Sequence, residues 1–225
     1  LPETNHTPSA SFKAQFRSYP DLLRSATFWA YSLCLMCSLA SFYAFLGGAA
    51  LVGAEVFGLS PSELGLGMGS TSIGFMLGTY LTGRFAGRIP MIKLLLAGRW
   101  IATLGPLMSM ALLALGFFNP FVVVAGAICV GLGNGLTVPS ANAGVMSVNP
   151  RLAGSASGLS GGVVVLGGAA TAALMGVLVG GESGAYVLLF VMSLTSFFGL
   201  LTVLWIKRIE AAAEAATGTA SEAPH

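Results

Sequence analysis

Few residues in this sequence have the types and spacing of a catalytic site. Ser160 lies in Gly158-Leu-Ser160-Gly161, which matches the G-x-S-G pattern of intramembrane serine proteases. A serine nucleophile needs a base such as histidine within reach, and the 2 histidines, His6 and His225, lie near the two ends of the chain. We therefore predict that the protein is not an enzyme.

The cysteines do not indicate a metal or redox centre. Cys34 and Cys37 form a C-x-x-C pair, but no second pair and no histidine accompany them, and Cys129 stands alone. All of them lie in apolar sequence, where a thiol behaves as a small buried hydrophobe. The sequence also lacks an H-E-x-x-H motif, a phosphate-binding loop and a dinucleotide fingerprint, so we expect no cofactor.

Two asparagines stand out within apolar sequence. Asn134 lies between two glycines, and Asn142 follows on the same run, rotated by only about 80° on a helix. An amide in lipid needs a partner in the protein or in a water-filled cavity, and Pro139 between them predicts a bend that frees backbone carbonyls. Two interpretations stay open, a structural hydrogen bond to a neighbouring helix and the lining of a substrate cavity.

A second set of candidates lies near the middle of the first apolar run. It consists of Ser41, Phe42, Tyr43 and Phe45. Aromatic residues at such spacing serve helix packing more often than they line a ligand pocket, so both interpretations stay open here as well.

We expect no charged residue at the centre of a membrane helix, where a charge costs at least about 2.5 kcal/mol. Arg99 comes nearest, but it lies in the first turns of its run, so its side chain is expected to snorkel to the membrane surface. Glu55, at the far end of its run, is the only acidic candidate for proton coupling. A coupling carboxylate is therefore expected outside this chain.

The elements that carry these residues are predicted to be membrane helices. The chain has 225 residues, of which 55% are hydrophobic and 8% charged, and a mean hydropathy of +0.85, whereas about 25% of residues are charged in soluble domains. A helix needs around 20 apolar residues to cross a bilayer. Six runs qualify, at residues 27–52, 60–81, 94–118, 121–146, 156–179 and 185–206.

These runs lack the alternation of a membrane β-barrel, so the sequence predicts an all-α transmembrane bundle of six helices over residues 27–206. The second run opens with Ser60-Pro61-Ser62-Glu63, the pattern of a capped helix start. Residues 1–26 are interpreted as a juxtamembrane linker or a short interfacial helix. The tail, residues 207–225, is predicted to begin as a helical extension at Glu210 and then to become disordered.

Glycines recur four residues apart along several runs, which in lipid allows helices to pack closely. The pairs are Gly74 and Gly78, Gly131 and Gly135, Gly154 and Gly158, Gly158 and Gly162, and Gly176 and Gly180.

The basic residues indicate how the bundle lies in the lipid bilayer. All 10 lysines and arginines fall on the side of the two termini, and the opposite loops hold only Glu55, Glu63 and Glu182. Basic loops stay in the cytoplasm, so both termini are predicted to be cytoplasmic. The net charge of +2 gives no reason to expect a nucleic-acid partner.

The turn between the second and third runs carries the most distinctive pattern. Gly78-Thr-Tyr-Leu-Thr-Gly83-Arg84-Phe-Ala-Gly87-Arg88 resembles the cytoplasmic loop motif that major facilitator transporters carry in each six-helix half. Gly83 stands where that motif has an acid, and the following Gly-Arg is blurred, as is usual for the copy in the second half. The resemblance therefore implies a C-terminal half.

Other motifs resemble the drug-resistance branch that exports bicyclomycin and chloramphenicol (Bcr/CflA). They are Phe57-Gly-Leu-Ser-Pro61, Gly74-Phe-Met-Leu-Gly78, Pro139-Ser-Ala-Asn142 and Ala153-Gly-Ser-Ala-Ser-Gly158. The likeness covers nearly all of residues 1–208. It implies half of a twelve-helix fold, two inverted three-helix repeats, and a cavity near the midplane lined by the first and fourth helices, which favours Asn134 and the aromatic residues as cavity lining.

The resemblance further implies a proton-coupled exporter of small hydrophobic compounds in the bacterial inner membrane, working by alternating access with an N-terminal six-helix half that holds the coupling acid. Gly78, Gly83, Arg84, Gly87 and Arg88 would form a cytoplasmic gating loop. One alternative is an uptake facilitator for a small metabolite on the same fold. Another is a stand-alone six-helix structural or assembly protein, although a chain that begins with Leu1 is expected to be a segment of a longer one.

Overall fold

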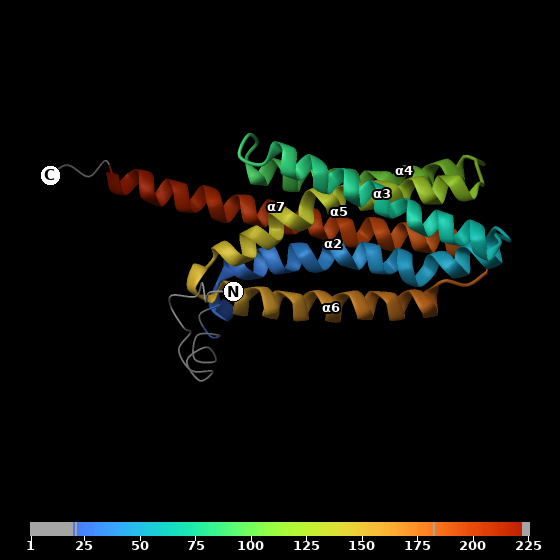
Figure 1. Ribbon diagram of the computed structural model, residues 1–225, viewed down its shortest axis with the longest axis horizontal. Helices are drawn as coiled ribbons and strands as arrows, with labels where there is room; N and C mark the ends of the chain where they lie inside the picture. The colour runs from blue at the N-terminus through green and yellow to red at the C-terminus, as the bar shows by residue number, and fades with distance from the viewer. Residues whose placement is uncertain (1–19, 21, 182, 222–225) are drawn as a thin grey trace, which may run out of the picture.

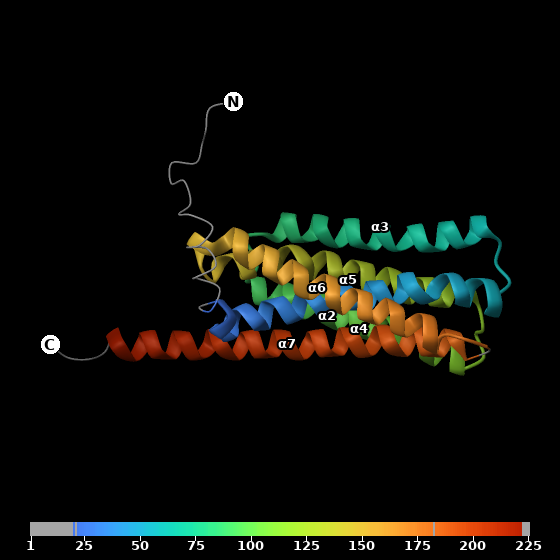
Figure 2. The same cartoon turned by 90° about the horizontal axis from the view of Figure 1, so that it is seen from below.

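The protein folds as a bundle of long helices. The computed structural model describes residue 20 and residues 22–181 and 183–221, and no strand occurs among them. The helices are α2 (Ala26–Leu51), α3 (Pro61–Phe85), α4 (Met91–Ala114), α5 (Pro120–Ser147), α6 (Ala153–Leu178) and α7 (Gly184–Ser221). A π-helix, η1 (Val52–Val56), continues α2, and a 3-10 helix, η2 (Pro150–Leu152), precedes α6. Figures 1 and 2 show the long helices lying side by side and running alternately in opposite directions, which confirms the all-α fold.

Local capping residues set where several helices begin. Ser25 accepts a hydrogen bond from the backbone N–H of Phe28 at 3.2 Å, at the start of α2. Ser60 and Glu63 form a capping box at the start of α3, which confirms the predicted start. Asn119 caps the first turn of α5 in the same way. Each cap satisfies a backbone N–H that the helix itself leaves without an acceptor.

Among the described residues, five helices are long and apolar enough to cross a membrane. These spans are Ala26–Val56, Met91–Ala114, Pro120–Ser147, Pro150–Leu178 and Gly184–Ala215. α3 has 25 residues, enough for about 37 Å of helix, but its glycines, serines and threonines lower its hydropathy. The predicted second run, residues 60–81, therefore falls below the hydropathy of these five spans, although α3 lies along the bundle like the other five helices (Figure 2).

The first three and the last three of these six helices make matching sets of contacts. α2 packs against α6 and α7, and α5 packs against α3 and α4. α2 also contacts α5, and α4 contacts α7. Exchanging α2 with α5, α3 with α6, and α4 with α7 reproduces this set of contacts, which is the pairing that two inverted three-helix repeats require.

The glycine pairs divide into a packed group and an open group. A Cβ added at Gly78 would collide with the backbone of Leu132 and Gly135, and one at Gly131 would collide with the backbone of Thr71, so α3 and α5 meet backbone to backbone. A Cβ at Gly158 would meet nothing within 4 Å. The same is true of Gly154, Gly162, Gly176 and Gly180. The predicted packing role holds for the pairs of α3 and α5, whereas the pairs of α6 face open space.

α7 extends well beyond the last apolar residues and reaches Ser221. Alanine and glutamate, which are strong helix formers, dominate the sequence after Glu210. The hydroxyl of Tyr31 in α2 donates a hydrogen bond to Glu210 Oε1 at 2.8 Å and ties the extension to the bundle. The helical start of the tail therefore continues further than expected. The possible interfacial helix in residues 1–26 lies almost wholly outside the described residues.

Candidate functional site

The two ends of the bundle carry opposite charge. α2, α4 and α6 begin at what we call the proximal end, and α3, α5 and α7 begin at the distal end (Figure 1). Among the described residues, the basic side chains at the proximal end are Arg24, Arg84, Arg88, Lys93, Arg151, Lys207 and Arg208. The distal end carries Glu55 and Glu63 and no described basic residue. The predicted charge asymmetry is therefore present in the folded chain, with Arg99 as the exception.

The predicted gating loop connects α3 to α4 at the proximal end. Gly83, Arg84 and Arg88 are exposed, and Gly87 has a φ of 74°, which favours glycine. Neither guanidinium of the loop makes a hydrogen bond or ion pair within the described part of the chain. Gly78 lies apart from them, buried in the contact between α3 and α5. The two arginines are thus available to a partner outside these residues.

The residues predicted to line a substrate cavity lie in different places. Ser41 is buried and donates a hydrogen bond to the α2 backbone at 2.7 Å. Phe42 and Tyr43 are half-buried with ring centroids 6.2 Å apart, Phe45 is buried near the distal end, and Asn142 is exposed. Successive residues of a helix point about 100° apart, so Ser41, Phe42 and Tyr43 point in different directions. Its assignment to a substrate cavity stays a prediction.

Arg99 does not reach the membrane surface. Its side chain is 0% exposed and lies between α4, α5 and α7. A Cβ placed on Gly199 of α7 would lie 3.1 Å from Arg99 Cδ, so the missing side chain of that glycine makes room for the arginine. The prediction of a snorkelling side chain is wrong, because the rotation of α4 points Arg99 into the bundle and not along it.

Arg99 forms a buried polar cluster with α5. Its Nη2 donates to Asn134 Oδ1 at 2.6 Å, and its Nε donates to Thr137 Oγ1 at 3.1 Å. Gly98 and Gly133 bring the two helices close enough for these bonds, because a Cβ on either would collide with the facing helix. Asn134 is 1% exposed, which favours the structural interpretation of its amide.

The cluster holds a positive charge without a described acidic partner. An arginine stays protonated in proteins, and neutral oxygens are its hydrogen-bond acceptors here. Arg99 Nη1 and Asn134 Nδ2 have no hydrogen-bond partner among the described residues. The bundle therefore buries a cation whose compensation rests on the Asn134 and Thr137 dipoles.

Pro139 lies inside α5, and the bend predicted at this residue stays a prediction. A proline has no N–H, so the carbonyl of Gly135 loses its usual helical donor. The hydroxyl of Thr82 in α3 lies 3.1 Å from that carbonyl and 3.0 Å from the carbonyl of Gly78 in its own helix, and it shares its one proton between them. α5 continues as a single helix to Ser147. The freed carbonyl thus serves the contact between α3 and α5.

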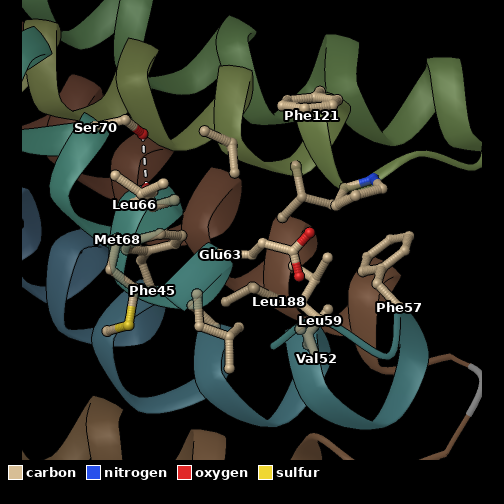
Figure 3. Close-up of a pocket in the computed structure, with 17 residues that line it drawn as sticks. Phe45, Val52, Phe57, Leu59, Glu63, Leu66, Met68, Ser70, Phe121 and Leu188 are labelled. Atoms are coloured by element: carbon tan, nitrogen blue, oxygen red, sulfur yellow. Dashed lines mark hydrogen bonds between the residues drawn. The ribbon is translucent and has the colours of Figure 1, made fainter. Parts of the chain in front are cut away.

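The distal end contains a pocket, which we call the distal pocket. Its volume is about 460 Å³, within the usual range for small-molecule sites. It lies between α2 with η1, α3, α5 and α7, and Figure 3 shows the side chains that point into it. The lining residues are Phe45, Ala49, Val52, Gly53, Phe57, Leu59, Glu63, Leu64, Leu66, Gly67, Met68, Ser70, Pro120, Phe121, Val123, Val124 and Leu188.

Glu63 is the one ionisable residue in this lining. Its Oε2 accepts hydrogen bonds from the Ser60 backbone N–H at 2.8 Å and from the Ser60 hydroxyl at 2.7 Å. The capping residues of α3 therefore also hold a carboxylate at the wall of an apolar pocket. The capping pattern could be found in the sequence, but the pocket could not, because its walls come from helices far apart along the chain.

Comparison with known proteins decides the family. A sequence profile described as Major Facilitator Superfamily matches residues 31–224. The chain belongs to the major facilitator superfamily. It is a multi-pass membrane protein of a transporter family, and no curated protein matches its sequence.

One solved structure of the same fold is a bacterial homolog of the human lysosomal transporter Spinster, in an inward-facing and unoccupied conformation. The two chains share 18% sequence identity with a TM-score of 0.51, and the match covers 92% of this chain and 51% of that one. The likeness concerns the fold alone, and this major facilitator chain spans about half the length of that transporter.

Two features of this major facilitator chain escaped prediction, the interior position of Arg99 and the distal pocket. A signal for Arg99 was present, since Gly98 precedes it and Gly133 precedes Asn134. A glycine beside a polar residue on two helices indicates a close crossing at which the polar groups can meet. No comparable signal existed for the pocket.

Proposed function

We propose that this chain is the C-terminal six-helix half of a proton-coupled exporter of small hydrophobic compounds, belonging to the drug-resistance branch that exports bicyclomycin and chloramphenicol. It works by alternating access in the bacterial inner membrane, with both termini in the cytoplasm. The observation that carries the substrate class is the distal pocket, whose walls are apolar except for Ser70 and Glu63. The branch assignment rests on the motifs around the loop from Gly78 to Arg88.

The partner in this proposal is an N-terminal six-helix half that packs against α3 and α6. Both helices are poorly covered in this chain: Leu66 is 76% exposed and Leu166 is 75% exposed. The open glycines of α6 leave room for a close helix contact, since a side chain at Gly158 or Gly162 would meet nothing within 4 Å of its Cβ. A match to about half the length of a related fold supports the same arrangement.

The outer surfaces of α4 and α7 face the lipid in this arrangement. Large apolar side chains are exposed along both helices. Contact of such a surface with water is unfavourable, whereas contact with lipid is not. These side chains include Trp100, Leu104 and Met108 on α4, and Phe190, Phe197, Phe198, Leu201 and Leu204 on α7.

Proton coupling requires a titrating acid, and we place it in the partner half. Of the described carboxylates, Glu55 and Glu63 lie at the distal end, and Glu210 and Glu214 lie in the part of α7 that follows its last apolar residues. Among the described residues, the buried side chain that carries a charge at membrane depth is Arg99, which stays charged and does not carry protons.

Transport by the full-length protein that contains this chain tests the proposal. In everted membrane vesicles with an inward-acidic proton gradient, accumulation of a hydrophobic fluorescent substrate should follow addition of the energy source and collapse when a proton uncoupler is added. Accumulation that persists undiminished with the uncoupler would refute proton coupling. Movement of a small polar metabolite, but of no hydrophobic compound, would support an uptake facilitator.

The gating loop is tested in the same vesicles. In this proposal, Arg84 and Arg88 pair with acids or helix C-termini of the partner half when the cytoplasmic side is closed. Replacing both with glutamine should therefore abolish most transport while the protein still folds and reaches the membrane. Lys93→Gln is the matched control, because Lys93 is also basic, exposed and proximal. Normal transport by the double variant would refute the gate.

A further inference from the structure

The distal pocket combines apolar walls with one oriented carboxylate. Phe45 and Val52 contribute from α2 and η1, Phe121 from α5 and Leu188 from α7. Figure 3 shows the Glu63 side chain among them, with its carboxylate directed into the space between these walls. A ligand in this space would have most of its surface against hydrocarbon and one group close to a negative charge.

The carboxylate of Glu63 is held in place and still has capacity to bind. Both hydrogen bonds from Ser60 go to Oε2, at 2.8 Å from the backbone nitrogen and 2.7 Å from the hydroxyl. No described residue donates to Oε1, which therefore remains available as an acceptor. An ionised carboxylate accepts several hydrogen bonds or faces a cation.

The surroundings favour positive charge. Glu55 of η1 lies at the same end of the bundle, and the described residues at this end include no lysine or arginine. The aromatic rings of Phe57 and Phe121 in the lining also attract cations through their π faces. An anionic ligand would be repelled, and an uncharged chain beside Glu63 would remove water from a carboxylate without replacing its interactions.

We propose that the distal pocket binds amphiphilic organic cations, with the apolar body against Phe45, Val52, Phe121 and Leu188 and the positive group beside Glu63 Oε1. Binding of the cation to the distal pocket does not depend on transport. The role of the pocket as a release site at the outer surface rests on the proposed export with cytoplasmic termini.

The test measures equilibrium binding of tetraphenylphosphonium to the purified full-length protein in phosphatidylcholine nanodiscs, beside binding of the uncharged triphenylphosphine oxide. Glu63→Gln should weaken tetraphenylphosphonium binding about fivefold, as expected for loss of a solvent-accessible ion pair. The same substitution should leave the binding of triphenylphosphine oxide unchanged. Glutamine can still accept the hydrogen bonds of Ser60, so the helix start is preserved. Glu55→Gln is the matched control, because Glu55 is distal but does not line the pocket.

A second variant locates the site. Gly67 lines the pocket, and a Cβ on it would lie in ordinary contact, 3.4 Å from Val124 Cγ2. Gly67→Phe should therefore fill the pocket and abolish binding of both probes without disturbing the helix contact. Equal binding of the charged and uncharged probes, or tetraphenylphosphonium binding that survives Glu63→Gln or Gly67→Phe, would overturn the proposal. If binding behaves as expected but the protein does not accumulate substrate in the vesicle assay, the proposed export would be refuted and the proposed binding site would be supported.

Discussion

The hydrogen bond between Arg99 and Asn134 predicts a large effect of a single substitution. Asn134→Leu keeps the number and branching of the side-chain heavy atoms but removes the oxygen that lies 2.6 Å from Arg99 Nη2. Both residues are buried, at 0% and 1% exposure, so water cannot replace the lost acceptor. A hydrogen bond to a charged group contributes about 1.5–3 kcal/mol. Thr137 still accepts from Nε, so we expect the variant to lose about 2 kcal/mol and not the larger cost of a fully isolated buried charge.

The measurement is the free energy of unfolding in mixed micelles, obtained by titration with sodium dodecyl sulfate and followed by circular dichroism. Asn142→Leu is the matched control, because Asn142 lies on the same helix and is exposed. It should change the free energy by no more than about 0.5 kcal/mol.

A double-mutant cycle with Arg99→Met isolates the pair. Without the guanidinium, Asn134→Leu should cost far less, giving a coupling energy of about 1–2 kcal/mol. If Asn134→Leu and Asn142→Leu were equally costly, or if the cycle showed no coupling, the buried cluster would not stabilise the bundle and the reasoning would be refuted.

Three further predictions concern the helix contacts. Gly78→Val should destabilise the bundle by about 1–3 kcal/mol, because the valine side chain would collide with the α5 backbone. Gly158→Val should leave the free energy of unfolding nearly unchanged. It should reduce transport if the partner half packs against Gly158. Equal stability of the two variants in the micelle titration would contradict the division of the glycines. Thr82→Val should cost about 1 kcal/mol, because the carbonyl of Gly135 would lose its donor, and an unchanged unfolding midpoint would argue against this bond. Tyr31→Phe should speed hydrogen exchange in residues 207–215 of α7 relative to the rest of that helix, because it removes the bond to the α7 extension, and exchange equal to that of the unmodified chain would exclude this role.

The helix starts could be predicted because their causes are local. Ser60, Pro61 and Glu63 lie within one turn, and their capping interactions involve only that turn. The release of a carbonyl by Pro139 is local in the same way. The glycine spacing also predicted close packing correctly for α3 and α5, since only a small residue permits that approach.

The polar residues were harder to place, because their surroundings come from other helices. Arg99 lies about 12 Å from the start of α4, close enough to the surface for snorkelling, yet Gly199 on α7 and Asn134 on α5 draw it inward. The rotation of a helix about its axis decides which outcome occurs, and rotation follows from packing against neighbours. A hydrophobic run that is apolar on all sides gives little indication of that rotation.

A helical membrane bundle with asymmetric ends could be predicted from composition, periodic glycines, capping residues and the charge of the loops. Each of these features depends on contacts between residues near in the chain or on transfer into lipid. The loop from Gly78 to Arg88 indicated the family in the same way. Only the tertiary structure placed Arg99 against Asn134 and joined Phe45, Glu63, Phe121 and Leu188 in one pocket. Those arrangements depend on how separate helices turn and cross, and that is set by close packing between surfaces far apart in the sequence.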